Sequence, residues 1–76
     1  MNISEQDFQY MLECQERDLA TLLVEEHHMT IHQALDTLYN SETYRALTNE
    51  QTGLFYQSPL YVFSYLQNEL QTGKMS

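Results

Sequence analysis

The segment from Tyr39 to Tyr65 constrains the fold of this 76-residue chain more than any other part of its sequence. It contains five of the six tyrosines, two of the three phenylalanines, the single proline and one of the two glycines. Proline and glycine mark the places where a chain turns or where a helix begins or ends. The segment therefore predicts both where the fold turns and where its aromatic side chains gather.

Ser58 followed by Pro59 is the strongest local signal in the chain. Serine caps the first N–H groups of a helix, and proline is favoured at the first helical position because its missing N–H would be unpaired there anyway. Gly73 predicts the end of the same helix. Between them lies an apolar stripe at helical spacing, formed by Val62, Phe63, Leu66 and Leu70.

Three further caps predict the rest of the fold. Ser4 precedes an amphipathic pattern over about residues 5–27, in which Gln15 interrupts the apolar stripe. Thr30 and Gln33 have capping-box spacing and predict a second helix of about ten residues, packed antiparallel to the first. Ser41 predicts a third helix of one or two turns.

Residues 54–56 are aromatic-rich and bounded by turn residues, so a short extended segment is predicted there, which could pair across a dimer. The fold class is all-α, a small bundle of three to four helices. Residues 1–76 are expected to form a single helical domain with an ordered core over about 4–71.

Charge restricts the partners. Eleven acidic residues against three basic ones give a net charge of −8 and a pI near 4.4. Such a surface repels nucleic-acid phosphates and anionic lipids, so neither nucleic acid nor membrane is expected to bind directly. It attracts a basic protein, although acidity that serves only solubility is the alternative.

Nothing in the sequence predicts an internal covalent or metal staple. Cys14 is the single cysteine, so a disulfide within the chain is excluded, and no Cys/His zinc motif is present. A small domain without staples often gains stability by burying surface against another chain, which predicts a homodimer or other homo-oligomer using the region Leu54–Leu70. The N-terminus has no signal-peptide pattern, which favours a cytoplasmic location.

His27, His28 and His32 follow Glu25 and Glu26, a combination that metal sites use. However, the cap at Thr30 breaks the helix between them, which favours a solvated helix end instead. Cys14 lies among acidic residues, which disfavour a reactive thiolate. No catalytic set, phosphate-binding loop or cofactor motif is present, so a protein with no enzymatic activity and no cofactor is expected.

The aromatic side chains form the candidate interaction site. A core this small cannot easily bury all of them, and clustered exposed aromatics mark interfaces. Scattered half-burial is the other interpretation. The candidate interaction residues are Tyr39, Tyr44, Phe55, Tyr56, Tyr61 and Tyr65.

Two stretches, Tyr39-Asn-Ser-Glu-Thr-Tyr-Arg-Ala-Leu47 and Thr52-Gly-Leu-Phe-Tyr-Gln-Ser-Pro-Leu-Tyr-Val-Phe63, resemble a family of short bacterial helical proteins of unknown function. The resemblance covers about residues 28–70. It implies a small bacterial helical protein that binds a partner, and some similar small proteins are encoded near toxin–antitoxin-like modules. The net charge of −8, the aromatic cluster, the short length and the absence of a catalytic set lead to the expected function, an acidic antitoxin-like or chaperone-like partner of a basic protein. A self-assembling structural domain, with the aromatic patch as its homodimer interface, is the alternative.

Overall fold

Four α-helices and two short 3₁₀ turns make up the part of the chain that the structure, a computed structural model, describes: residues 3–73. The α-helices are α1 (Glu5–His27), α2 (Ile31–Tyr39), α3 (Glu42–Thr48) and α4 (Pro59–Thr72). The 3₁₀ turns η1 (Glu50–Thr52) and η2 (Leu54–Tyr56) connect α3 to α4. Within residues 3–73 there is no strand, which confirms the all-α prediction.

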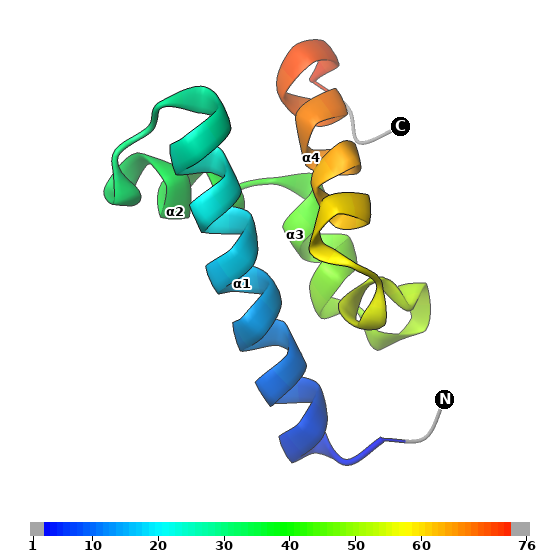
Figure 1. The fold of residues 1–76 in the computed structure, drawn as a ribbon. Coiled ribbons are helices and arrows are strands. Elements are labelled where there is room, and N and C mark those ends of the chain that lie inside the picture. Colours follow the sequence, from blue (N-terminus) through cyan, green and yellow to red (C-terminus); the bar gives the residue numbers. More distant parts are fainter. Residues whose placement is uncertain (1–2, 74–76) are drawn as a thin grey trace.

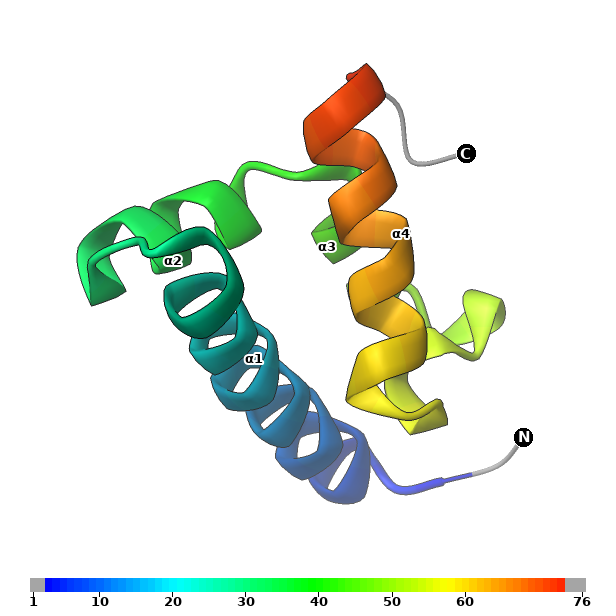
Figure 2. The same cartoon turned by 45° about the horizontal axis from the view of Figure 1, so that its top comes forward.

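The longest helix, α1, forms one side of the molecule, and α3 and α4 form the other (Figure 1). α1 and α4 are oriented parallel to each other, so the N-terminal half of α1 lies near η2 and the start of α4. α2 runs across the C-terminal end of α1 (Figure 2). The antiparallel arrangement predicted for α1 and α2 is therefore wrong: the link His28–Thr30 turns the chain across α1 instead of back along it.

One core joins all of these elements except η1. α1 supplies four of its buried apolar residues and α4 supplies three, while the shorter helices and η2 supply the rest. Because α1 and α4 contribute most of it, their apolar stripes define the centre of the fold. The buried apolar residues of α1 are Leu12, Leu19, Ala20 and Leu23, and those of α4 are Val62, Phe63 and Leu66.

Each predicted helix cap is present. Ser4, Thr30, Ser41 and Ser58 each accept a hydrogen bond from the backbone N–H three residues later, and the Thr30–Gln33 capping box is complete. Gly73 ends α4 with a φ of 81°, in the left-handed region that favours glycine. These contacts lie within a few residues of one another, which is why the sequence alone predicts them.

Residues 54–56 form a 3₁₀ turn, so the extended segment predicted there is wrong. Gly53 enters the turn with a φ of 71°, and the N–H of Gln57 closes it by donating to the Leu54 carbonyl over 3.1 Å. Leu54 and Phe55 are both buried. Consecutive residues of an extended strand point to opposite faces, whereas a tight turn lets both side chains enter one core.

A carboxylate that is distant in the sequence holds α3 against α4. Glu69 of α4 accepts from the backbone N–H of Glu42 over 2.7 Å and from that of Thr43 over 2.9 Å. The Thr43 hydroxyl donates to it as well, over 2.8 Å. Glu69 therefore satisfies two N–H groups in the first turn of α3 that have no partner within the helix.

Replacing Ser58 with alanine should lower stability by about 1 kcal/mol, because the Tyr61 N–H loses its acceptor at 3.2 Å. In a domain of this size that lowers the melting temperature by roughly 4–8 °C, measured by circular dichroism. Ser64→Ala is the matched control. The Ser64 hydroxyl donates to the Tyr61 carbonyl in the middle of α4, where alanine is the better helix former. Equal melting shifts for the two variants would contradict a capping role for Ser58.

Candidate functional site

The six candidate aromatic residues form three pairs and not one patch. Tyr39 contacts Tyr44 with ring centroids 5.1 Å apart, Phe55 contacts Tyr56 at 5.1 Å, and Tyr61 contacts Tyr65 at 5.3 Å. All three pairs are edge-to-face, the preferred geometry of aromatic contacts. The structure thus places the two residues of each pair in contact, and the three pairs lie in different surroundings.

The first pair packs against the side of α1 that carries Glu16. The Tyr44 hydroxyl donates to the Glu16 carboxylate over 2.6 Å, which ties α3 to α1. Burial, that hydrogen bond and the nearby negative charge all raise the pKa of Tyr44. Tyr44 is half-buried and serves this packing, while about half of Tyr39 is exposed.

The Tyr61–Tyr65 pair lies on α4. The two hydroxyl groups are hydrogen-bonded at 3.0 Å, and this bond, followed by the electrostatic effect of Tyr61, raises the pKa of Tyr65. Tyr61 is exposed and Tyr65 is half-buried. The pair is therefore a surface feature and is accessible to a partner.

Phe55 is a core residue, only 2% exposed, and is not available at the surface. It contacts Phe8 of α1 edge-to-face at 4.9 Å, which attaches η2 to α1. Tyr56, next to it, is exposed. Of this pair, only Tyr56 can contact a partner directly.

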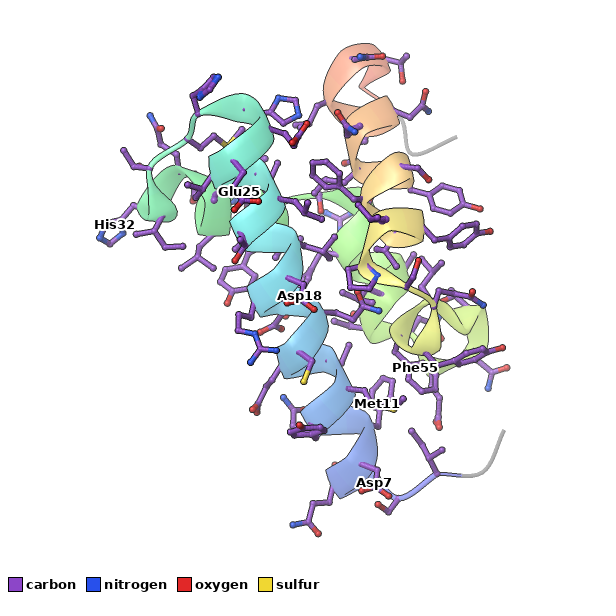
Figure 3. The ribbon with its side chains drawn as sticks, in the orientation of Figure 1. Asp7, Met11, Asp18, Glu25, His32 and Phe55 are labelled. Carbon is purple, nitrogen blue, oxygen red and sulfur yellow. The ribbon has the colours of Figure 1, made fainter. Side chains whose placement is uncertain are left out.

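Tyr56 borders a cavity of about 210 Å³ between the N-terminal half of α1 and the segment that leads into α4. Figure 3 shows Met11 and Phe55 on the two sides of this region. Aromatic and sulfur-containing side chains form most of the wall. These wall residues are Tyr10, Met11, Cys14, Phe55 and Tyr56, and Pro59 adds a further apolar side chain.

A second cavity, of about 400 Å³, lies further along α1 and shares Asp18 and Pro59 with the first. Leu22 of α1 and Leu60 of α4 give it an apolar wall. Leu60 is 69% exposed, and Tyr10 at the first cavity is 68% exposed. We call the surface formed by the lining residues of these two cavities the α1–α4 face.

Gln15 is the residue in this region whose role could not be predicted from the sequence. It is 5% exposed and donates through Nε2 to the carbonyl oxygens of Phe55 and Gln57, over 3.3 and 2.5 Å. These bonds hold the segment between η2 and α4 against α1. A glutamine in an apolar stripe indicates a polar partner for that side chain. The sequence does not show which partner, because the segment that Gln15 binds lies about forty residues away.

Asp18 is the acidic residue on this face, and Figure 3 shows it midway along α1. Arg17 contacts it at 3.6 Å, with both side chains substantially exposed, so this ion pair contributes little. Glu16 lies two residues earlier, about 200° around the helix, and faces α3 instead. The α1–α4 face and the Tyr39–Tyr44 pair are therefore on different sides of α1.

The histidines do not gather into a site. Across residues 3–73, no three His, Cys, Asp or Glu side chains are grouped so that they could hold a metal ion. His27 ends α1 and contacts Phe63 with ring centroids 6.2 Å apart, whereas His28 is the left-handed cap of that helix. His32 lies in the first turn of α2 (Figure 3).

No helix in the described part of the chain combines the length and the apolar character that crossing a membrane requires. The chain matches no protein-family model, and comparison with curated proteins and with solved structures finds no similar protein.

Proposed function

We propose that this chain is a non-enzymatic protein-interaction domain that binds a basic protein, in the manner of an antitoxin or a dedicated chaperone. The observation that carries the proposal is the α1–α4 face, where exposed apolar side chains surround an acidic residue. Leu60 and Tyr10 are two of the most exposed large apolar side chains in the described part of the chain. Monomeric domains rarely expose contiguous apolar surface without using it.

The overall charge supports a basic partner. At −8, the chain attracts and orients positively charged proteins before contact, which raises association rates. Apolar contacts then provide affinity that the screening of charges by salt does not weaken.

Affinity capture with the full-length chain tests this function. A basic protein should be retained from bacterial lysate, and the complex should form again from the two purified components. Its association rate should fall as salt is raised from about 0.05 to 0.5 M, because screening shortens the range of the attraction. Capture of the chain alone, at every salt concentration, would contradict the proposal.

Self-assembly through α4 is the second candidate function. Leu60, Tyr61 and Leu70 are all exposed on this one helix, which favours an apolar contact between two copies. The net charge of −8 on each copy opposes self-assembly, because two copies repel each other.

Tyr61→Ala tests the second candidate. Because Tyr61 is nearly half exposed, the variant should keep the circular dichroism spectrum of the wild type. Its free energy of unfolding should lie within about 1 kcal/mol of the wild-type value. If α4 is a homodimer interface, light scattering should show a dimer for the wild type and a shift toward the 9.0 kDa monomer for the variant. A wild-type monomer at high micromolar concentration would remove the self-assembly alternative.

A further inference from the structure

One buried hydrogen-bond acceptor lacks a partner, and it lies at the first cavity. The Nε2 of Gln15 faces two carbonyl oxygens, so the opposite assignment of the amide would place oxygen against oxygen. Oε1 is thereby identified as the unpaired atom, with no hydrogen-bond partner in residues 3–73. Buried acceptors are almost always paired in native proteins, with protein groups or with ordered water, so this one marks a place where a donor from outside the chain, a water molecule or a ligand group, completes the hydrogen bond.

The other groups around this cavity favour a cationic donor. Asp18 lies one helical turn after Gln15 and lines the same cavity, and its carboxylate can only accept hydrogen bonds. The rings of Tyr10 and Tyr56 add π faces, which attract cations. Neither cavity is lined by a lysine or an arginine. Lysine and arginine head groups, which donate hydrogen bonds and accept none, match this set.

The second cavity requires a different side chain. It adjoins the first at Asp18 and Pro59, and Leu22 and Leu60 form its apolar wall. An aliphatic or aromatic side chain that enters it would remove apolar surface from water without leaving a polar group unpaired. A ligand that fills both cavities thus carries a cation and an apolar group close together.

We infer that the α1–α4 face binds a peptide segment of a second protein in which a lysine or arginine lies beside an apolar residue. The cationic head group enters the first cavity, pairs with Asp18 and donates to Gln15 Oε1, while the apolar side chain enters the second cavity. This inference rests on the proposed function and names the surface and the ligand chemistry. Charge complementarity selects a basic partner over a second copy of this chain, which is itself strongly acidic.

Access to Gln15 Oε1 requires a small movement, because the atom is covered in the free chain. Met11 lies one turn earlier on α1, lines the same cavity and is half-buried. An unbranched methionine changes rotamer readily and adapts to a ligand. In the inferred complex, Met11 is the side chain at this cavity that can adapt most easily to the head group.

A titration followed by nuclear magnetic resonance tests the inference on the full-length, ¹⁵N-labelled chain. The probe is a synthetic 14-residue helical peptide of leucine and lysine, and its counterpart carries glutamate at every lysine position. The lysine peptide should give saturable shifts over residues 10–22 and 56–60, and the Gln15 side-chain amide signals should move with them. The glutamate peptide should bind at least about tenfold more weakly, because like charges repel.

Two matched variants separate specific from general attraction. Asp18→Asn should weaken binding of the lysine peptide roughly fivefold, since it removes the charged acceptor at the cavity. Glu13→Gln removes the same charge from an exposed position of α1 that lines neither cavity, and it should have little effect. Leu60→Ser should weaken binding without any change in charge.

Three results would overturn the inference. The first is equal weakening by Asp18→Asn and Glu13→Gln, and the second is shifts spread without saturation over the whole acidic surface. The third is absence of binding by the lysine peptide at millimolar concentration. If affinity capture nevertheless yields a basic partner that contacts the Tyr39–Tyr44 side of α1, the proposed function stands and the inference about the α1–α4 face fails.

Discussion

Phe55→Ala should unfold a large share of the molecules at room temperature. Phe55 is 2% exposed and contacts the rings of Phe8 and Tyr56 at 4.9 and 5.1 Å. Removing a buried phenylalanine side chain costs about 3–5 kcal/mol. Domains are stabilised by about 0.05–0.15 kcal/mol per residue, which is roughly 4–11 kcal/mol for this chain. A domain of this size without a disulfide or a metal is expected at the low end of this range, where the loss approaches the whole stability of the fold. Urea denaturation followed by circular dichroism measures it.

Two controls separate the core role of Phe55 from its position in the wall of the first cavity. Phe55→Leu keeps most of the buried volume and should cost less than half as much as Phe55→Ala. Tyr56→Ala truncates the adjacent exposed ring, so it should lower stability far less. A Phe55→Ala variant with the wild-type urea midpoint would show that the side chain is not part of the core.

The caps and helices could be predicted from the sequence because each depends on residues close together in the chain. Ser58 and Pro59 fix the start of α4 through contacts within one turn, and Gly73 fixes its end in the same way. Thr30 and Gln33 begin α2 by a reciprocal pair of hydrogen bonds three residues apart. Local signals of this kind do not depend on how the helices pack.

The features that could not be predicted depend on partners far away in the sequence. Gln15 is visible in the sequence only as an interruption of an apolar stripe, because the carbonyl groups that it binds lie 40 and 42 residues later. Phe55 is predicted to be an interaction residue, but it is buried in the core. Composition does not show which aromatic side chains become buried. The direction of α2 relative to α1 is likewise determined by packing and not by the cap at Thr30.

The candidate site could be predicted in part. Tyr56 and Tyr61 are on the surface, as an interaction residue requires, and Tyr44 is mostly engaged in holding α3 to α1. The candidate aromatic residues nevertheless form three separate pairs. Their clustering in the sequence therefore does not produce one continuous aromatic surface. Leu60 and Asp18 could not be predicted to share a face, because they belong to helices that begin more than fifty residues apart.

Glu69→Gln should also destabilise the fold strongly, although Glu69 lies outside the main core. The carboxylate accepts two backbone N–H groups of α3 and the Thr43 hydroxyl, and glutamine can offer only one oxygen to these donors. Hydrogen bonds to a charged group contribute about 1.5–3 kcal/mol, and an N–H left facing an amide NH₂ is unpaired. A loss of roughly 2 kcal/mol at pH 7 is expected, with early unfolding of α3 detected by hydrogen exchange.

The effect of Glu69→Gln should disappear in acid. Burial acts to raise the pKa of Glu69, but the N–H groups of Glu42 and Thr43, the Thr43 hydroxyl and the charge of Arg45 outweigh it and hold the pKa below its ordinary value of 4.5. The folded state therefore favours the ionised carboxylate. Its stabilising contribution is fully present above the unfolded-state pKa and is lost as the pH falls through the lower folded-state pKa.

The measurement is the difference in melting temperature between wild type and Glu69→Gln from pH 7 to pH 2.5. It should be constant down to about pH 5 and should shrink below about pH 4.5, as the wild-type carboxyl takes up its proton. Glu13→Gln is the matched control, because it removes one negative charge from an exposed position of α1. Taking the difference between variants isolates Glu69 from the other carboxyl groups, which titrate in both proteins. If Glu13→Gln shows the same pH dependence, the effect comes from net charge and not from the contact of Glu69 with the first turn of α3.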